Sequence, residues 1–128
     1  MNRVKNITNG FIKGLWDKAA ESPRLRMNFD MRNSAEDTSQ RMLNALLPGT
    51  VVSIHRHETT EESVICLCGK LEEIFYEECA GEFKEIARYT LCPNDGKFGI
   101  QVPAGMWHSI NVIEPSAIFE AKDGAYVP

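Results

Sequence analysis

The sequence is poor in basic charge, in histidine and in long hydrophobic runs. Its 128 residues hold 14 Lys and Arg against 18 Asp and Glu, and the formal net charge is −4. Nucleic-acid and membrane surfaces need clustered basic charge, so this balance argues against either as a partner. No apolar run approaches the roughly 20 residues needed to span a bilayer. Residues 1–16 lack the apolar stretch of a secretory signal, and we therefore expect a cytoplasmic protein.

Cysteine is present but gives no sign of a disulfide framework. The four cysteines are Cys66, Cys68, Cys79 and Cys92. A chain of this length buries a sufficient core without disulfides, and no export signal is visible, so free thiols are expected. Cys66 either packs as a small apolar side chain, which the frequent burial of cysteine favours, or lies near a metal. A zinc site at Cys66 and Cys68 is the weakest of the three interpretations.

Residues 1–48 carry helical patterns. Thr8 is placed to cap a helix that ends at Ser22-Pro23, because its apolar residues recur at spacings of three and four. These residues are Phe11, Ile12, Leu15, Trp16 and Ala19. The alternating residues 24–32 favour an extended segment. A second helix is predicted from Ser34 to the Pro48-Gly49 stop, with Leu43, Leu46 and Leu47 as its buried side.

From Gly49 onward the pattern is that of β-structure. Short segments rich in β-branched and aromatic residues alternate with turn signals. The predicted strands are Thr50–His57, Ser63–Cys68, Lys70–Glu77, Glu82–Leu91, Gly99–Val102, His108–Ile113 and Ala117–Ala121. Such strands with no helix between them indicate a sandwich or a barrel. No linker or repeat interrupts the chain, so one domain is predicted.

His55, His57 and Glu62 have the spacing of metal ligands. Side chains alternate across a strand, so two histidines two residues apart point to the same face. Glu62 begins the next predicted strand, and the short connection keeps its carboxylate near the histidine pair. An imidazole pair with a nearby carboxylate suits a transition metal.

His108 supplies the third imidazole from a distant part of the chain. Pro103 and Gly105 predict a tight turn directly before it. Three imidazole nitrogens and one carboxylate suit one divalent ion such as zinc, iron, nickel, manganese or cobalt. An open coordination position would favour a catalytic site over a closed structural one.

These residues resemble the two sequence motifs of the cupin superfamily. The first motif reads Gly, five residues, His-x-His, four residues, Glu, six residues, Gly, and is matched by Gly49, His55, His57, Glu62 and Gly69. The spacing to Gly69 selects Glu62 over Glu61 as the ligand. In the second motif Pro103, Gly105 and His108 match, whereas Lys97 and Val112 stand where the motif has Gly and Asn.

A narrower resemblance covers nearly the whole chain. The chain is similar to the WbuC family of cupin metalloproteins in the segments 22–26, 40–46, 55–57 and 119–126. The resemblance implies a mainly β protein, a cupin double-stranded β-helix or jelly-roll barrel with N-terminal helices. It implies one cupin domain over 1–128, with 1–48 as a helical extension packed on a barrel of 49–128. It also links the chain to bacterial polysaccharide metabolism of the O-antigen type.

Three further residues are candidates for contact with a substrate. Arg26 and Arg41 lie in the family-like segments, and a guanidinium suits a phosphate or carboxylate. The alternative for each arginine is a solvated ion pair. Glu120 stands in an apolar run and is a candidate catalytic acid or base, with a solvent-facing carboxylate as the alternative. The acidic residues from Glu72 to Glu85 are interpreted as a solvated hairpin.

Two functions of different classes follow. The first is a metal-dependent enzyme acting on a small sugar or sugar-nucleotide-like substrate, by isomerisation, epimerisation or, with iron, dioxygen chemistry. The second is a non-catalytic module that binds or senses a small molecule, since one fold hosts both. A metal that only stabilises the barrel is a third possibility. A homodimer is expected because exposed sheet edges need covering.

Overall fold

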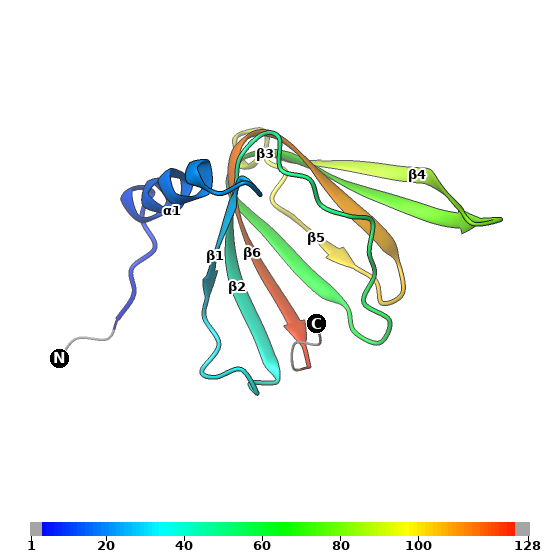
Figure 1. The fold of residues 1–128 in the computed structure, drawn as a ribbon, viewed down its shortest axis with the longest axis horizontal. Helices are drawn as coiled ribbons and strands as arrows, with labels where there is room; N and C mark the ends of the chain where they lie inside the picture. The colour runs from blue at the N-terminus through cyan, green and yellow to red at the C-terminus, as the bar shows by residue number, and fades with distance from the viewer. Residues whose placement is uncertain (1–3, 125–128) are drawn as a thin grey trace.

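The described part of the chain is one antiparallel β-structure with a single α-helix on one side. The computed structural model describes residues 4–124. Its elements are α1 (Asn9–Glu21), β1 (Arg26–Asp30), β2 (Ser39–Leu46), β3 (Glu62–Cys79), β4 (Glu82–Leu91), a 3₁₀ turn (Pro93–Asp95), β5 (Gly99–Val102) and β6 (Trp107–Asp123). The strand order is β1-β2-β6-β3-β4, and β5 also pairs with β3. Figure 1 shows the long strands bending so that the sheet curves around an interior.

β3 and β6 are long enough to serve both halves of the curved sheet. The first half of β3 pairs with the end of β6 and with β5, whereas its second half pairs with the start of β6 and with β4. The pairing register shifts between Cys66 and Leu71. Gly69 lies in this bend at φ +91°, and an added Cβ there would stand 2.2 Å from the Pro115 carbonyl oxygen. The bend therefore requires glycine. The curved antiparallel sheet as a whole confirms the prediction of a mainly β jelly-roll fold.

The two faces of the curved sheet have different coverings. Its inner face carries the main apolar core: Leu46, Val64, Cys66, Leu71, Phe75, Leu91, Val102, Val112 and Ile118. On the outer face α1 packs through Leu15 against Leu43 and Ala45 of β2, with Phe11 and Phe29 at the edge. β2 is therefore covered on one side by the helix and faces the interior on the other.

The first predicted helix is confirmed as α1. The Thr8 side chain accepts a hydrogen bond from the Phe11 amide at 3.1 Å and so caps the helix. Leu15 and Ala19 are buried against the sheet, and the helix ends at Glu21 before Ser22. Trp16 donates its indole N–H to the Ser116 carbonyl at 2.9 Å, which ties α1 to β6.

The second predicted helix is wrong, because this segment forms β2. Arg26–Asp30 is extended as expected, and β2 pairs with it on one side and with β6 on the other. Leu43 and Ala45 then face α1, while Leu46 faces the inner core. The sheet thus begins at Arg26, and of the helical extension predicted over 1–48 the described residues 4–48 contain one helix, α1.

Two further details of the predicted strands are corrected. Residues 50–57 are mostly irregular, and only His55 forms a β-bridge, with His108. β6 runs without a break through Glu114-Pro115, where the sequence predicts a turn. No helix within residues 4–124 has the length and apolarity to cross a membrane. The family-like tail reaches Tyr126, which lies outside the described residues.

Candidate metal centre and cavity

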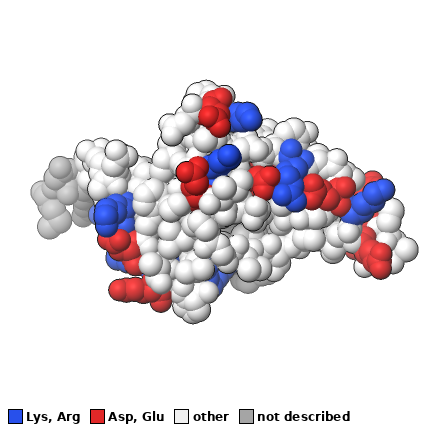
Figure 2. Space-filling view, turned by 90° about the horizontal axis from the view of Figure 1, so that it is seen from above, with Lys and Arg blue, Asp and Glu red and all other residues white. Residues whose placement is uncertain are grey.

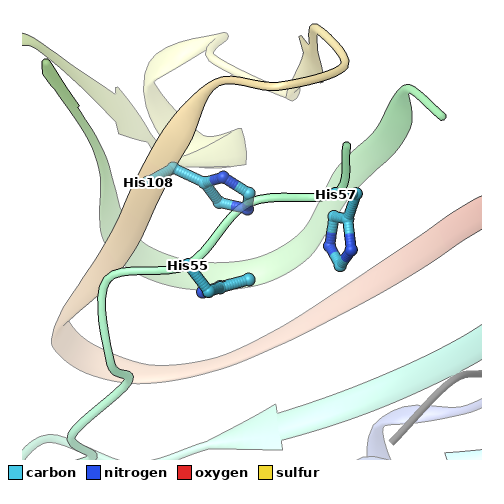
Figure 3. A group of neighbouring side chains, drawn as sticks. All are labelled: His55, His57 and His108. Atoms are coloured by element: carbon cyan, nitrogen blue, oxygen red, sulfur yellow. The ribbon is translucent and has the colours of Figure 1, made fainter. Parts of the chain in front are cut away.

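The three histidines meet at one point although His108 is far from the other two in the chain. Their nearest ligand nitrogens all lie within 4.8 Å of one another. The His55 and His108 ring centroids are 4.2 Å apart, and the His57 ring lies 5.4 Å from His55 and 5.8 Å from His108. Figure 3 shows the rings of His55 and His57, from the loop before β3, facing His108 of β6 across a common space. This cluster suits a metal ion.

Backbone hydrogen bonds hold the loop and β6 in this arrangement. The His55 amide donates to the His108 carbonyl at 3.0 Å, and the His108 amide donates back at 2.8 Å. The Gly105 amide donates to the His57 carbonyl at 2.7 Å, which binds the predicted turn before β6 to the same loop. Gly105 has φ +80°, so the turn needs glycine. The proline–glycine turn thus positions His57 as well as His108.

Two of the imidazoles are oriented through their Nδ1 atoms. His108 Nδ1 lies 2.9 Å from the Met106 carbonyl oxygen, and His55 Nδ1 lies 2.9 Å from the Ser53 carbonyl oxygen. A carbonyl only accepts, so each Nδ1 carries the proton and each Nε2 keeps its lone pair. Metal-binding histidines are held in this way.

Glu62 adds a carboxylate to the cluster. Its Oε2 lies 3.4 Å from His57 Nε2 and its Oε1 lies 3.9 Å from His108 Nε2. Burial opposes ionisation of Glu62, but its close approach to His57 and the positive charge of the three imidazoles in their protonated form outweigh it and lower its pKa. Burial lowers the pKa of His108. A neutral imidazole beside an ionised carboxylate is the state that a divalent cation needs.

Unpartnered nitrogens support the fit of a metal to this site. His57 Nε2 and His108 Nε2 are buried and have no hydrogen-bond partner. Buried polar atoms without a partner are rare in native proteins and indicate a missing ion or water. Lys122 opposes the binding of a metal. Its Nζ lies 3.3 Å from His57 Nδ1 and places a positive charge beside the cluster.

The histidine cluster opens onto a cavity of about 650 Å³. The cavity lies along the inner faces of β1, β2, β3 and β6, and its lining includes His55, His108, Glu62, Asn28, Gln40, Asn44, Ile110, Ile118 and Glu120. A second hollow of about 170 Å³, bounded by His57 and Lys122, shares His55, Glu62 and Glu120 with it. The cluster thus sits where the two spaces meet.

Glu120 faces the interior rather than solvent. Its Oε1 accepts a hydrogen bond from Asn44 Nδ2, which fixes the orientation of the carboxyl group. Burial raises the pKa of Glu120 to about 8, and the negative charge of Glu62 adds to the effect. A carboxyl that titrates near neutral pH is suited to acid–base chemistry.

The two predicted arginines are placed differently. Arg26 lines the cavity and donates one Nη1 hydrogen bond to the Val51 carbonyl at 3.2 Å. Arg41 instead donates to the Met31 carbonyl at 2.7 Å and forms an ion pair with Asp37 at 3.4 Å. Arg41 is not among the residues that line the described cavities. The structure therefore brings Arg26, but not Arg41, to the candidate site.

Glu73 is a cavity residue that the sequence reasoning missed. The sequence predicts it as part of the solvated acidic hairpin, but it is 1% exposed and lines the cavity. The sequence pattern that could have revealed it is the alternation of a strand. Leu71 and Phe75 are core residues, and Glu73 lies between them on the same face of β3. Burial raises the pKa of Glu73 well above its ordinary value, and charge on Glu120 and Glu62 adds to this.

The cysteines take no part in the cluster. All four are free thiols. Cys66 is buried and donates its thiol to the Cys68 carbonyl at 3.3 Å. Burial raises the pKa of Cys66 to about 11, which keeps the thiol protonated.

Solved structures with the same fold define the class of this protein. CapF, described in one structure as a capsular polysaccharide assembling protein from Staphylococcus aureus, matches with a TM-score of 0.61 and 19% identity over 79% of this chain. The chain spans only 29% of CapF. The Schizosaccharomyces pombe Cnp3 cupin domain matches with a TM-score of 0.54 and 14% identity, over 77% of this chain and 64% of that one. YcfD, a ribosomal oxygenase from Escherichia coli, matches with a TM-score of 0.55 and 19% identity, over 70% of this chain and 23% of that one.

These likenesses assign the chain to the cupin fold. Residues 7–88 also match the profile of a family described as a domain of unknown function, DUF6016, and the protein belongs to this family. No functionally curated protein matches the sequence.

Proposed function

We propose that this protein is a metal-binding cupin enzyme acting on a small sugar or sugar-nucleotide-like substrate. The observation that carries the proposal is the convergence of His55, His57 and His108 beside Glu62 at a polar cavity. In this proposal the four side chains hold one divalent transition metal. The cavity of about 650 Å³ has the volume of a small-molecule site.

The chemistry divides between the metal and the protein. When bound, the metal would polarise a carbonyl or hydroxyl of the substrate or activate a water. Glu120, held by Asn44, would give or accept a proton within the cavity. Arg26 would hold an acidic group of the substrate from the cavity wall. Isomerisation and epimerisation are two reactions that need these parts and no further co-substrate.

The carbohydrate substrate is supported by two likenesses. CapF is described as a capsular polysaccharide assembling protein, and this chain shares its fold over a part of it. The sequence resemblance to WbuC cupins points to the same area of metabolism. We therefore propose a role in bacterial polysaccharide metabolism, in the cytoplasm.

The surface charge supports a small substrate over a nucleic acid. On the face in Figure 2, basic and acidic side chains lie next to one another rather than in patches of one sign. Arg88, for example, pairs with Glu72 at 3.0 Å and with Glu85 at 2.7 Å. Basic side chains that are neutralised in this way do not form a continuous positive surface for a phosphate backbone.

Metal analysis of protein purified without an affinity tag tests the site. We expect one divalent ion per chain, and loss of that ion in His55→Ala, His108→Ala and Glu62→Gln. Glu61→Gln is the matched control, because Glu61 is the exposed neighbour and bonds Gln101 at 3.2 Å. A full metal content in both His108→Ala and Glu62→Gln would contradict the proposed ligands.

Turnover of sugar nucleotides by the metal-loaded protein tests the activity. We expect product from the wild type and none from Glu62→Gln. Tight binding without turnover would favour the non-catalytic binding module instead.

An iron-dependent dioxygenase is the second candidate enzyme, supported by the shared fold of YcfD. It requires iron in the purified protein and uptake of dioxygen during turnover. Zinc or manganese without dioxygen uptake would argue against it.

A further inference from the structure

Glu73 is an acid at the wall of the cavity that has no hydrogen-bond or ion-pair partner among residues 4–124. It is 1% exposed, and its Oε2 is buried with no hydrogen-bond partner. Within residues 4–124, no hydrogen bond or ion pair reaches its carboxyl group. A buried polar group without a partner destabilises a fold, so its retention needs an explanation. An apolar residue between Leu71 and Phe75 would extend the core.

The surroundings of Glu73 make it a hydrogen-bond donor. Burial and the nearby charges of Glu120 and Glu62 raise its pKa well above the ordinary value, which favours the protonated form of the carboxyl. A protonated carboxyl presents an O–H, which bonds an acceptor oxygen and not an ammonium group. The cavity wall thus offers a donor for a hydroxyl or carbonyl oxygen.

Arginines line the same cavity from the segment around β1. Arg24 and Arg26 are cavity residues, and Arg26 uses only its Nη1 atom, on the Val51 carbonyl. Arg32 also lines the cavity and is held by Asp30 at 2.6 Å. Arg24 is exposed, and no ion pair ties it to another side chain in the described part of the chain. Two guanidinium groups therefore remain able to bind an anion.

We propose that the cavity binds a small polyhydroxylated acid, whose carboxylate or phosphate is held by Arg24 and Arg26 and one of whose oxygens contacts Glu73. This inference rests on the proposed function in taking the cavity as the substrate site, and it narrows the substrate to an anionic one. Glu73 is then a binding residue that selects for an acceptor oxygen. A neutral sugar of the same size would lose the contacts with both arginines.

Binding of three probes to the wild-type protein tests the class of ligand. The probes are D-glucuronate, D-glucose 6-phosphate and D-glucose, titrated calorimetrically into metal-free and metal-loaded protein. We expect at least one of the two anions to bind, and D-glucose to bind at least tenfold more weakly. The two anions separate a carboxylate ligand from a phosphate ligand. If neither anion binds better than D-glucose, the inference is overturned.

Variants test the residues. Glu73→Leu removes the donor and suits the apolar neighbours, so we expect at least tenfold weaker anion binding with an unchanged or raised Tm. A Tm that does not fall is the readout that a structural role would not give, because removal of a structural contact lowers Tm. Glu73→Gln, which keeps an N–H donor, should restore part of the affinity. Glu77→Gln, an exposed carboxylate on the same strand, is the matched control.

The arginines need a separate comparison. Arg24→Met and Arg26→Met together should weaken anion binding at least tenfold and leave D-glucose binding unchanged. Lys84→Met on the exposed β4 edge is the control for loss of positive charge. Wild-type affinity in Glu73→Leu, or in the double arginine variant, overturns the inference.

The experiments distinguish failure of the anion-binding inference from failure of the proposed metal enzyme. If the protein holds no metal but binds an anion through Glu73 and the arginines, the proposal of a metal enzyme is rejected and the anion-binding inference is supported. If the metal site holds but anion binding ignores these residues, the inference alone falls.

Discussion

At the scale of single residues, the three histidines differ in what holds their second nitrogen. His55 and His108 each bond a backbone carbonyl, whereas His57 faces the Lys122 ammonium at 3.3 Å. A carbonyl leaves the other nitrogen free for a cation, but a positive charge so close opposes one. Of the three proposed ligands, His57 is therefore the one whose binding of a cation is opposed by a neighbouring positive charge.

Removing the Lys122 charge should strengthen metal binding. Lys122→Met takes away a positive charge beside the cluster while keeping an apolar stem of similar length. We expect the affinity for a divalent ion to rise several-fold, measured by competition with a chelator of known affinity. Lys84→Met removes an equal charge from the exposed β4 and should leave the affinity unchanged. Weaker binding in Lys122→Met would instead assign the lysine a supporting role.

Glu73 should make the stability of the metal-free protein depend on pH. Its pKa is raised well above 4.5 in the folded state, so the folded protein keeps a proton that the unfolded chain loses. The stability that this proton supplies is fully present below pH 4.5 and is lost as the pH rises towards the folded pKa. Relative to Glu73→Gln, the wild type should lose at most about 1.4 kcal/mol of unfolding free energy per pH unit in this window.

Urea denaturation in the presence of a chelator measures this difference. Comparing wild type with Glu73→Gln cancels the contributions of the other titrating groups. Glu77→Gln on the same strand should follow the wild-type curve. Parallel curves for wild type and Glu73→Gln would show that Glu73 ionises as an ordinary surface acid.

At the scale of elements, the bend of β3 depends on Gly69. An added Cβ would meet the Pro115 carbonyl oxygen and Ser116 within 2.6 Å. Gly69→Ala should therefore destabilise the protein by more than about 3 kcal/mol, the range of severe single substitutions. Gly81→Ala is the control, because φ is +80° there but no atom lies within 4 Å of the added Cβ. It should cost about 1–2 kcal/mol from backbone strain alone. Equal losses in chemical denaturation would contradict the role of the close contact.

The sequence predicts elements well where their pattern has one covered face. α1 has one apolar stripe and a cap at Thr8, and both are found in the structure. β2 was assigned to the wrong class because both of its faces are covered, by α1 and by the interior. A strand covered on both faces loses the alternation that identifies it. Leu43, Leu46 and Leu47 then match a helical spacing.

The candidate site also contains residues that the sequence predicts and residues that it does not. The spacing of His55 and His57 and the turn before His108 predict a meeting of three imidazoles, which the structure contains. The binding of a metal there, with Glu62 as the fourth ligand, stays a prediction. Glu73 was missed because acids are expected at the surface. Its position follows only once its neighbours on β3 are known to face inward.

At the scale of the whole molecule, the proposed metal links the loop before β3 to β6. His55 and His57 come from the loop and His108 from β6, so a bound ion would join elements that otherwise meet through few hydrogen bonds. Removing the metal should lower Tm, and adding free metal at 100 times its Kd should restore about 2.7 kcal/mol. Differential scanning calorimetry measures the change. A His108→Ala variant stabilised equally by metal would show that the ion binds elsewhere.

The homodimer expected from the sequence also concerns the whole molecule, and it stays a prediction. β4 is an edge strand, and Ile86, Tyr89 and Phe98 are exposed around a hollow of about 810 Å³ beside it. Apolar side chains on an exposed edge favour association. Light scattering should give twice the monomer mass, and Tyr89→Lys should return it to the monomer mass. A monomeric wild type would contradict the prediction.

β6 carries His108 near its start and Glu120 near its end, both turned to the interior, while Phe119 between them packs outward beside α1. Successive side chains alternate over residues 118–123, beyond the register shifts opposite residues 114–117, so the acid faces the cavity only while this half keeps its pairing register. A one-residue slip of this half would send the acid to solvent and the aromatic ring into the cavity. A change of length in this half is therefore tolerable only in pairs of residues, whereas the irregular stretch between β1 and β2 is free of that restriction.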